Sequence, residues 1–171
     1  MRKAVTNEEL MEAFDTHMGQ TEGHVQRLER IFEDLGVPAK GKHCKGMEGL
    51  LAEATELMGE DADADVLDAG LIAHAQSVEH YEIAGYGTAR TYSELLGFDD
   101  HTELLQQTLN EEEETDRILT EIAVTSVNLD AMDGDDDEGE EGETPENSPP
   151  RTAKSAQKKT VTKKSSGRSR S

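Results

Sequence analysis

Three separate segments of the 171-residue chain place histidine and carboxylate side chains in phase with apolar residues. These side chains are His17 and His24, then Glu79 with His80 and Glu82 on its flanks, and finally Glu112 with Asp116 one turn further on. A carboxylate among apolar neighbours is costly unless it is paired or bound to a metal. Carboxylates and imidazoles from facing helices are the ligands of iron and manganese sites in helical bundles. A site rich in carboxylates and poor in histidine favours iron or manganese over zinc.

Each of these side chains also has a purely structural interpretation. His24 can be a histidine at the edge of the core, His80 and Glu82 can face solvent, and Asp116 can pair with a nearby arginine. The acidic run Glu111–Glu114 is typical of a solvated face, and only the phase of Glu112 with the surrounding leucines singles it out. The coincidence of three segments, rather than any one residue, indicates a metal site.

Helices must bring these segments together, because their apolar residues recur every three or four positions. We expect three long helices and one short helix, over about residues 6–36, 46–60, 66–96 and 101–125, and no strand. Thr6 with Glu9, and Asp100 with Glu103, fit the capping-box spacing at the start of a helix. Gly36 and Gly97 are stop signals. The fold class predicted is an all-α, antiparallel helical bundle.

Charge divides the chain into three parts, although the net charge is −21 overall. We expect a helical domain over residues 1–129, an acidic disordered linker over 130–150 and a basic, Lys- and Ser-rich disordered tail over 151–171. The acidic domain should repel nucleic acid. The tail can contact DNA weakly in a salt-dependent way, or fold back on the acidic domain.

The remaining chemistry in the sequence is sparse. Cys44 is the single cysteine, so no disulfide forms within the chain, which fits a reducing compartment. The N-terminal residues lack the apolar stretch of a signal peptide, and no segment is apolar enough to cross a membrane. We therefore expect a cytoplasmic protein with no membrane partner.

Four blocks of sequence, in order, resemble the YciE/YciF-type ferritin-like stress proteins. They are HMGQTEGHVQRLERIFEDLG, KHCKGMEGLLAEA, VEHYEIAGYGTARTYSELLG and LLQQTLNEEEETDRILTEIA. The resemblance covers about residues 1–125. It implies a cytoplasmic, stress-linked, ferritin-like bundle that forms a homodimer and holds two metal ions per subunit. Members of the family usually begin with a further helix that carries a ligand-like glutamate, and the resemblance implies that this first helix is missing here. Either the start codon is assigned too far downstream, or this is a shortened member that lacks one metal ligand.

The resemblance also implies which residues hold the metal. Carried over position by position, the ligands are His24, Glu79, Glu82 and Glu112, with Asp116 as a weaker candidate. The Glu-x-x-His pair of ferritins is not intact, because Thr115 stands three residues after Glu112. This departure favours a non-enzymatic metal-binding role over oxidoreductase activity with iron or peroxide. The alternative function is a dimeric interaction scaffold whose basic tail contacts DNA or a protein.

Overall fold

The computed structural model describes residues 1–133, which form helices joined by turns and loops, with no strand among them. The helices are α1 (Glu8–Asp34), α2 (Lys45–Leu57), α3 (Ala64–Leu95), α4 (Asp99–Ile122), a π-helical turn η1 (Ala123–Val127) and α5 (Asn128–Asp133). The prediction of an all-α bundle with three long helices and one short one is therefore confirmed. Helix α5 continues past residue 129, where the helical domain was expected to end. Most of the predicted acidic linker and all of the basic tail lie outside the described residues.

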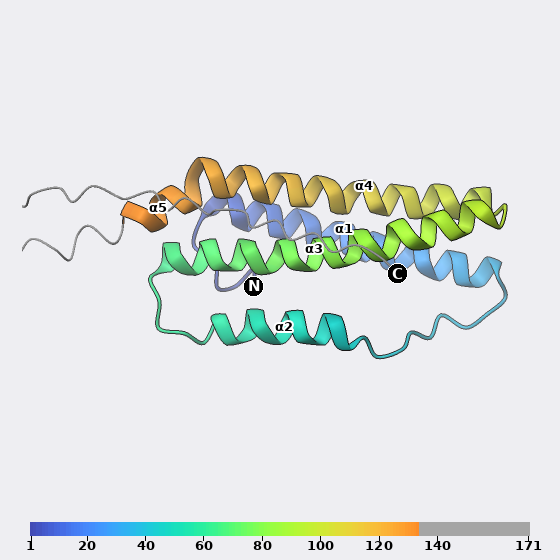
Figure 1. Cartoon of the computed structure of the whole chain (residues 1–171), viewed down its shortest axis with the longest axis horizontal. Coiled ribbons are helices and arrows are strands. Elements are labelled where there is room, and N and C mark those ends of the chain that lie inside the picture. Colours follow the sequence, from blue (N-terminus) through green and yellow to red (C-terminus); the bar gives the residue numbers. More distant parts are fainter. Residues whose placement is uncertain (134–171) are drawn as a thin grey trace, which may run out of the picture. The chain divides into compact units, whose positions relative to one another are not determined.

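The three long helices lie side by side with their axes roughly aligned (Figure 1). Helices α1 and α3 run in the same direction, and α4 returns antiparallel to both and packs along each of them. The short helix α2 runs antiparallel to α3 and packs against it. Because α4 contacts both α1 and α3, residues from three helices can meet at one level along the bundle.

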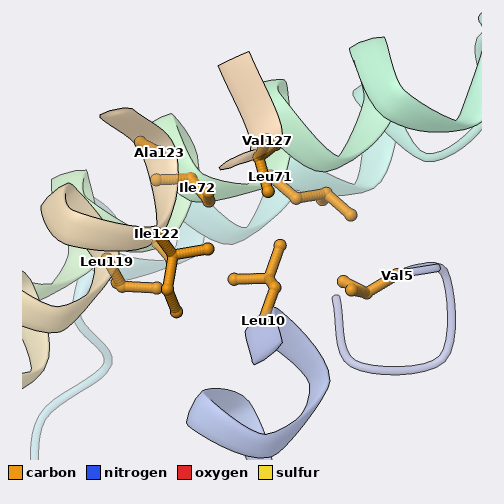
Figure 2. Close-up of a cluster of buried hydrophobic side chains, with 9 residues drawn as sticks. Val5, Leu10, Leu71, Ile72, Leu119, Ile122, Ala123 and Val127 are labelled. Atoms are coloured by element: carbon orange, nitrogen blue, oxygen red, sulfur yellow. The ribbon is translucent and has the colours of Figure 1, made fainter. Parts of the chain in front are cut away.

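The main apolar core lies where α1 and α3 begin and α4 ends (Figure 2). Leu10 of α1 points toward Leu71 of α3, and Leu119 of α4 is also fully buried. The other buried members of this cluster are Val5, Ile72, Ala75, Ile122, Ala123 and Val127. This core fixes the relative register of the three long helices.

The start of α1 is held by a carboxylate from α3 and not by the predicted capping box. Buried Asp68 accepts hydrogen bonds from the Thr6 amide at 3.1 Å, the Thr6 hydroxyl at 2.9 Å and the Asn7 amide at 2.7 Å. Asn7 is the actual N-cap, and its side chain accepts from the Leu10 amide at 3.0 Å. The predicted role of Thr6 was wrong because Asp68, 62 residues away, takes its hydroxyl.

The predicted helix ends are confirmed at two glycines. Gly36 and Gly97 have φ of 66° and 76°, which is the left-handed conformation that glycine adopts without strain. The second predicted capping box was wrong, because α4 begins at Asp99 and its N-cap is Phe98, which makes no side-chain cap. Asp100 is therefore the second residue of the helix.

Candidate metal centre

Three side chains from three helices converge in the middle of the bundle. His17 of α1 places Nε2 at 3.2 Å from Oε1 of Glu79 on α3 and at 3.6 Å from Oε2 of Glu112 on α4. One ligand atom from each of the three residues lies within 4.8 Å of the others. Glu79 is 3% exposed and Glu112 is fully buried, so the cluster combines two carboxylates and an imidazole away from bulk water.

The orientation of His17 is set by contacts on its other nitrogen. Nδ1 lies 3.0 Å from the Thr115 hydroxyl and 3.3 Å from Oε1 of Gln20. Thr115 donates its own hydroxyl proton to the Glu111 carbonyl at 2.9 Å, so its oxygen is left to accept from His17. The consistent assignment places the His17 proton on Nδ1. The lone pair on Nε2 then faces the two glutamates, as in a metal-binding histidine.

His24, two helical turns after His17, lies on the other side of Glu112. Its Nδ1 is 3.1 Å from Oε1 of Glu112, and its Nε2 is 2.8 Å from Oε2 of Glu111. The rings of His17 and His24 are 6.2 Å apart between centroids. Glu112 is thus placed between two imidazoles, and its two oxygens face different rings.

The buried polar atoms of this centre are short of hydrogen-bond partners. Both carboxylate oxygens of Glu112, Oε2 of Glu79 and Nδ1 of His24 form no hydrogen bond within residues 1–133. The 3.1 Å contact between His24 and Glu112 is close, but it is not directed as a hydrogen bond. Buried polar atoms are almost always satisfied, and leaving one unsatisfied costs about 1–3 kcal/mol. A divalent cation would satisfy these acceptor atoms together, so the residues present fit a metal.

Burial and charge shift the protonation of these groups. Burial raises the pKa of Glu112 above its usual range; contact with His24 opposes this shift and the nearby Glu79 carboxyl adds to it. For His17, burial is the largest single influence and lowers the pKa, but Glu79 and Glu112 together outweigh it, so the net shift is upward. The pKa of His24 is raised for the same reason, with Glu112 and Glu111 as the carboxylates. The site therefore holds protons tightly when no cation is present.

The other residues predicted as ligands lie in different surroundings. Glu82 follows Glu79 by one turn, is half-buried, and has its pKa raised by burial and by the charge of Glu112. Asp116 accepts from Gln76 at 3.0 Å and lies 3.1 Å from Nε2 of exposed His80. The structure therefore brings His24, Glu79 and Glu112 together, with Glu82 nearby, and gives Asp116 other partners.

His17 lies on the apolar side of its helix, as the sequence indicates, but it is absent from the predicted set of ligands. The signal was present, because seven residues separate His17 from His24 and residues two turns apart share a helix face. Glu111 was expected to face solvent as part of an acidic run, and this expectation is wrong. It is half-buried and forms an ion pair with Arg27 at 2.7 Å. Glu113 and Glu114 of the same run are exposed, as expected.

Comparison with known proteins decides the family. The family model described as "Domain of unknown function (DUF892)" matches residues 1–132. This chain belongs to the DUF892 family. Protein YciF of Escherichia coli (strain K12) is 43% identical over 129 residues, which cover 75% of this chain and 78% of YciF. The resemblance drawn from the four sequence blocks is thereby confirmed.

Two solved structures have the same fold. The crystal structure of the E. coli stress protein YciF matches with a TM-score of 0.70 and 43% identity, over 74% of this chain and 80% of that one. The protein YcfI from Rhodopseudomonas palustris matches with a TM-score of 0.67 and 41% identity, over 70% and 76% of the two chains. Among residues 1–133 of this DUF892 chain, no helix is both long and apolar enough to cross a membrane.

Proposed function

We propose that this DUF892 protein is a ferritin-like metal-binding protein of the stress response. Its metal would be held by His17, Glu79 and Glu112, with His24 and Glu82 as additional ligands. The observation that carries the proposal is the pair of fully buried Glu112 oxygens without a hydrogen-bond partner among the described residues. The relationship to the E. coli stress protein YciF supports the stress-response role.

The chemistry of the donor atoms selects the class of metal. Three carboxylates and two imidazoles provide hard and borderline ligands, with no thiolate nearby, and this set suits iron or manganese. The single cysteine, Cys44, is exposed and contacts Tyr81 at 3.0 Å. Glu112 lies between His17 and His24, so these three residues would hold the metal together. We therefore propose two ions of iron or manganese per subunit.

A bound metal would supply positive charge and, for iron, one-electron redox chemistry. The residues of this chain would orient and enclose it. Thr115 and Gln20 hold His17, and Glu79 and Glu112 would bind the metal away from bulk water, because both are buried. The ferritin Glu-x-x-His pair is replaced here by Glu112 and Thr115, and the imidazole comes from α1 instead. We propose a binding role first, with oxidation of iron(II) as a secondary possibility.

The test is metal binding by the full chain compared with two matched variants. Glu112→Gln removes a central carboxylate, and Glu113→Gln removes the adjacent exposed one with the same change in charge. We expect wild type and Glu113→Gln to retain about two Mn²⁺ or Fe²⁺ ions per subunit after desalting, and Glu112→Gln to lose them. Equal metal content in all three proteins would contradict the proposal. Iron(II) oxidation no faster than that of free iron would exclude the enzymatic role alone.

We also propose that the chain forms a homodimer, because its resemblance to the YciE/YciF-type proteins implies one. A monomer mass for the full chain in light scattering would contradict this.

We propose further that residues 151–171 contact DNA weakly. The support for DNA contact is charge alone, because residues 147–171 carry eight Lys or Arg and no acid. Gel retardation at low salt would compare the full chain with residues 1–146. We expect only the full chain to retard DNA, and equal mobility would contradict the role of the tail.

A further inference from the structure

Glu111 contacts both Arg27 and His24, and it is not a member of the candidate metal cluster. The Arg27 guanidinium donates two parallel hydrogen bonds to the carboxylate, from Nη1 to Oε2 and from Nη2 to Oε1, each at 2.7 Å. Such a bidentate pair fixes both the position and the ionised state of a carboxylate. Nη1 also donates to the buried Thr108 hydroxyl at 3.0 Å, which anchors the guanidinium on α4.

The ionised carboxylate of Glu111 determines which nitrogen of His24 carries a proton. Oε2 of Glu111 lies 2.8 Å from Nε2 of His24, and an ionised carboxylate can only accept. In the neutral imidazole, the proton must therefore be on Nε2. The other nitrogen, Nδ1, is left with a lone pair, and it faces Oε1 of Glu112 at 3.1 Å without a hydrogen bond. Two lone pairs face each other there, which is the arrangement that a cation between them would stabilise.

We propose that Glu111, held by Arg27, is a positioning residue that fixes His24 with its proton on Nε2 and with Nδ1 presented to the metal centre. Glu111 is not itself a ligand, because Arg27 engages both of its oxygens and His24 shares one. A carboxylate behind a metal-binding histidine orients the ring and increases its basicity as a ligand. This inference rests on the metal-binding function proposed above.

The first test reads the position of the proton directly, in the metal-free full chain. ¹⁵N NMR of histidine-labelled protein, at a pH where the imidazole is neutral, reports which nitrogen is protonated, and a His24→Gln sample assigns the signal. We expect the proton on Nε2 in wild type and in Glu113→Ala, the control that removes an exposed acid two residues away. In Glu111→Ala the ring is no longer held at Nε2, so we expect the proton on Nδ1, where a small rotation of the ring would let it be donated to Glu112.

The second test measures Mn²⁺ affinity in the same proteins. Loss of such an outer carboxylate costs about 10–100-fold in metal affinity, and we expect this for Glu111→Ala relative to Glu113→Ala. Glu111→Gln keeps an oxygen that can accept from Nε2, so it should fold and retain the wild-type proton position with an intermediate affinity. It also provides the comparison if Glu111→Ala does not fold.

The outcomes separate this inference from the proposed function. A proton on Nε2 in Glu111→Ala, or on Nδ1 in Glu111→Gln and wild type, would overturn the positioning role. Affinity for Mn²⁺ equal to that of Glu113→Ala would also overturn it. Failure of the wild type itself to bind Mn²⁺ would refute the metal-binding function, and the NMR result would still decide whether Glu111 fixes the proton on His24.

Discussion

Oε1 of Glu112 lies 3.1 Å from Nδ1 of His24, and neither atom forms a hydrogen bond within the described residues. The two groups come from different helices and are both almost fully buried. A fold that needed only an apolar core would place leucines at these positions at no such cost. A cation held by both atoms, as proposed above, would account for this relationship.

The stability of the metal-free protein should fall as pH rises from about 4.5, the ordinary carboxyl pKa, to above 6.5, the ordinary imidazole pKa. The pKa values of Glu82 and Glu112, and of His17 and His24, are all raised in the folded state. At these four groups the folded protein thus binds protons more tightly than the unfolded chain. Protonation favours folding, and this contribution is lost as pH rises through the folded pKa values.

Thermal unfolding with chelator or with Mn²⁺, at several pH values, checks this expectation. The gain in Tm on adding Mn²⁺ should grow with pH, because protons no longer compete for the ligands. Repulsion among the many exposed acids also changes with pH, so Glu112→Gln is the reference protein. If the stability of wild type depends on pH no more steeply than that of Glu112→Gln, the pH dependence does not come from this site.

Truncation of Leu10 should destabilise the domain strongly. Leu10 is fully buried at the junction of α1, α3 and α4 (Figure 2). Leu10→Ala leaves a cavity there, and such substitutions cost about 2–5 kcal/mol. Leu95→Ala is the matched control, because Leu95 is 78% exposed and its truncation should change stability by less than about 0.5 kcal/mol. Urea unfolding of both variants measures the difference, and similar values would show that the core is misplaced.

Asp68→Asn should loosen the start of α1. The carboxylate accepts from the Thr6 amide, the Thr6 hydroxyl and the Asn7 amide, and an asparagine amide can accept on only one of its two terminal atoms. We expect a loss of about 1–3 kcal/mol, with faster hydrogen exchange at the Thr6 and Asn7 amides. Asp65→Asn, one turn earlier and exposed, is the control. Unchanged exchange in Asp68→Asn would contradict the contact.

Two glycines of α2 should respond oppositely to substitution by alanine. A Cβ at Gly46 would lie 2.8 Å from the Tyr81 hydroxyl, whereas a Cβ at Gly49 would meet nothing within 4 Å. Gly46→Ala should therefore force the Tyr81 ring to shift away from α2 and lower Tm. Gly49→Ala should stabilise the helix by about 0.5–1 kcal/mol, since glycine is unfavourable inside a helix. Thermal unfolding of the two variants compares them, and a similar sign for both would refute the close contact.

Helical periodicity was sufficient to predict the long helices and to place Glu79 and Glu112 in the core. Gly36 and Gly97 end their helices as predicted because a left-handed residue is a local requirement. The error at Thr6 has the opposite cause, since its hydroxyl bonds to Asp68 across the bundle and no local pattern reports that contact. Local rules succeed where the partner is local and fail where it is distant.

The predictions about the metal centre succeeded and failed for the same reasons. Phase within α4 separated buried Glu112 from exposed Glu113, but it could not show that Glu111 meets Arg27 and His24 from another helix. The partners of Asp116 likewise depend on the register between α3 and α4. Single-helix periodicity does not contain that register, so Gln76 could not be foreseen as its partner.

The most direct test of the metal centre is a crystal of the full chain soaked in Mn²⁺ and measured at the manganese absorption edge. We predict anomalous density within bonding distance of His17, Glu79 and Glu112, and none there in Glu112→Gln. Anomalous density confined to exposed carboxylates, with the buried glutamates unliganded at saturating Mn²⁺, would contradict the account.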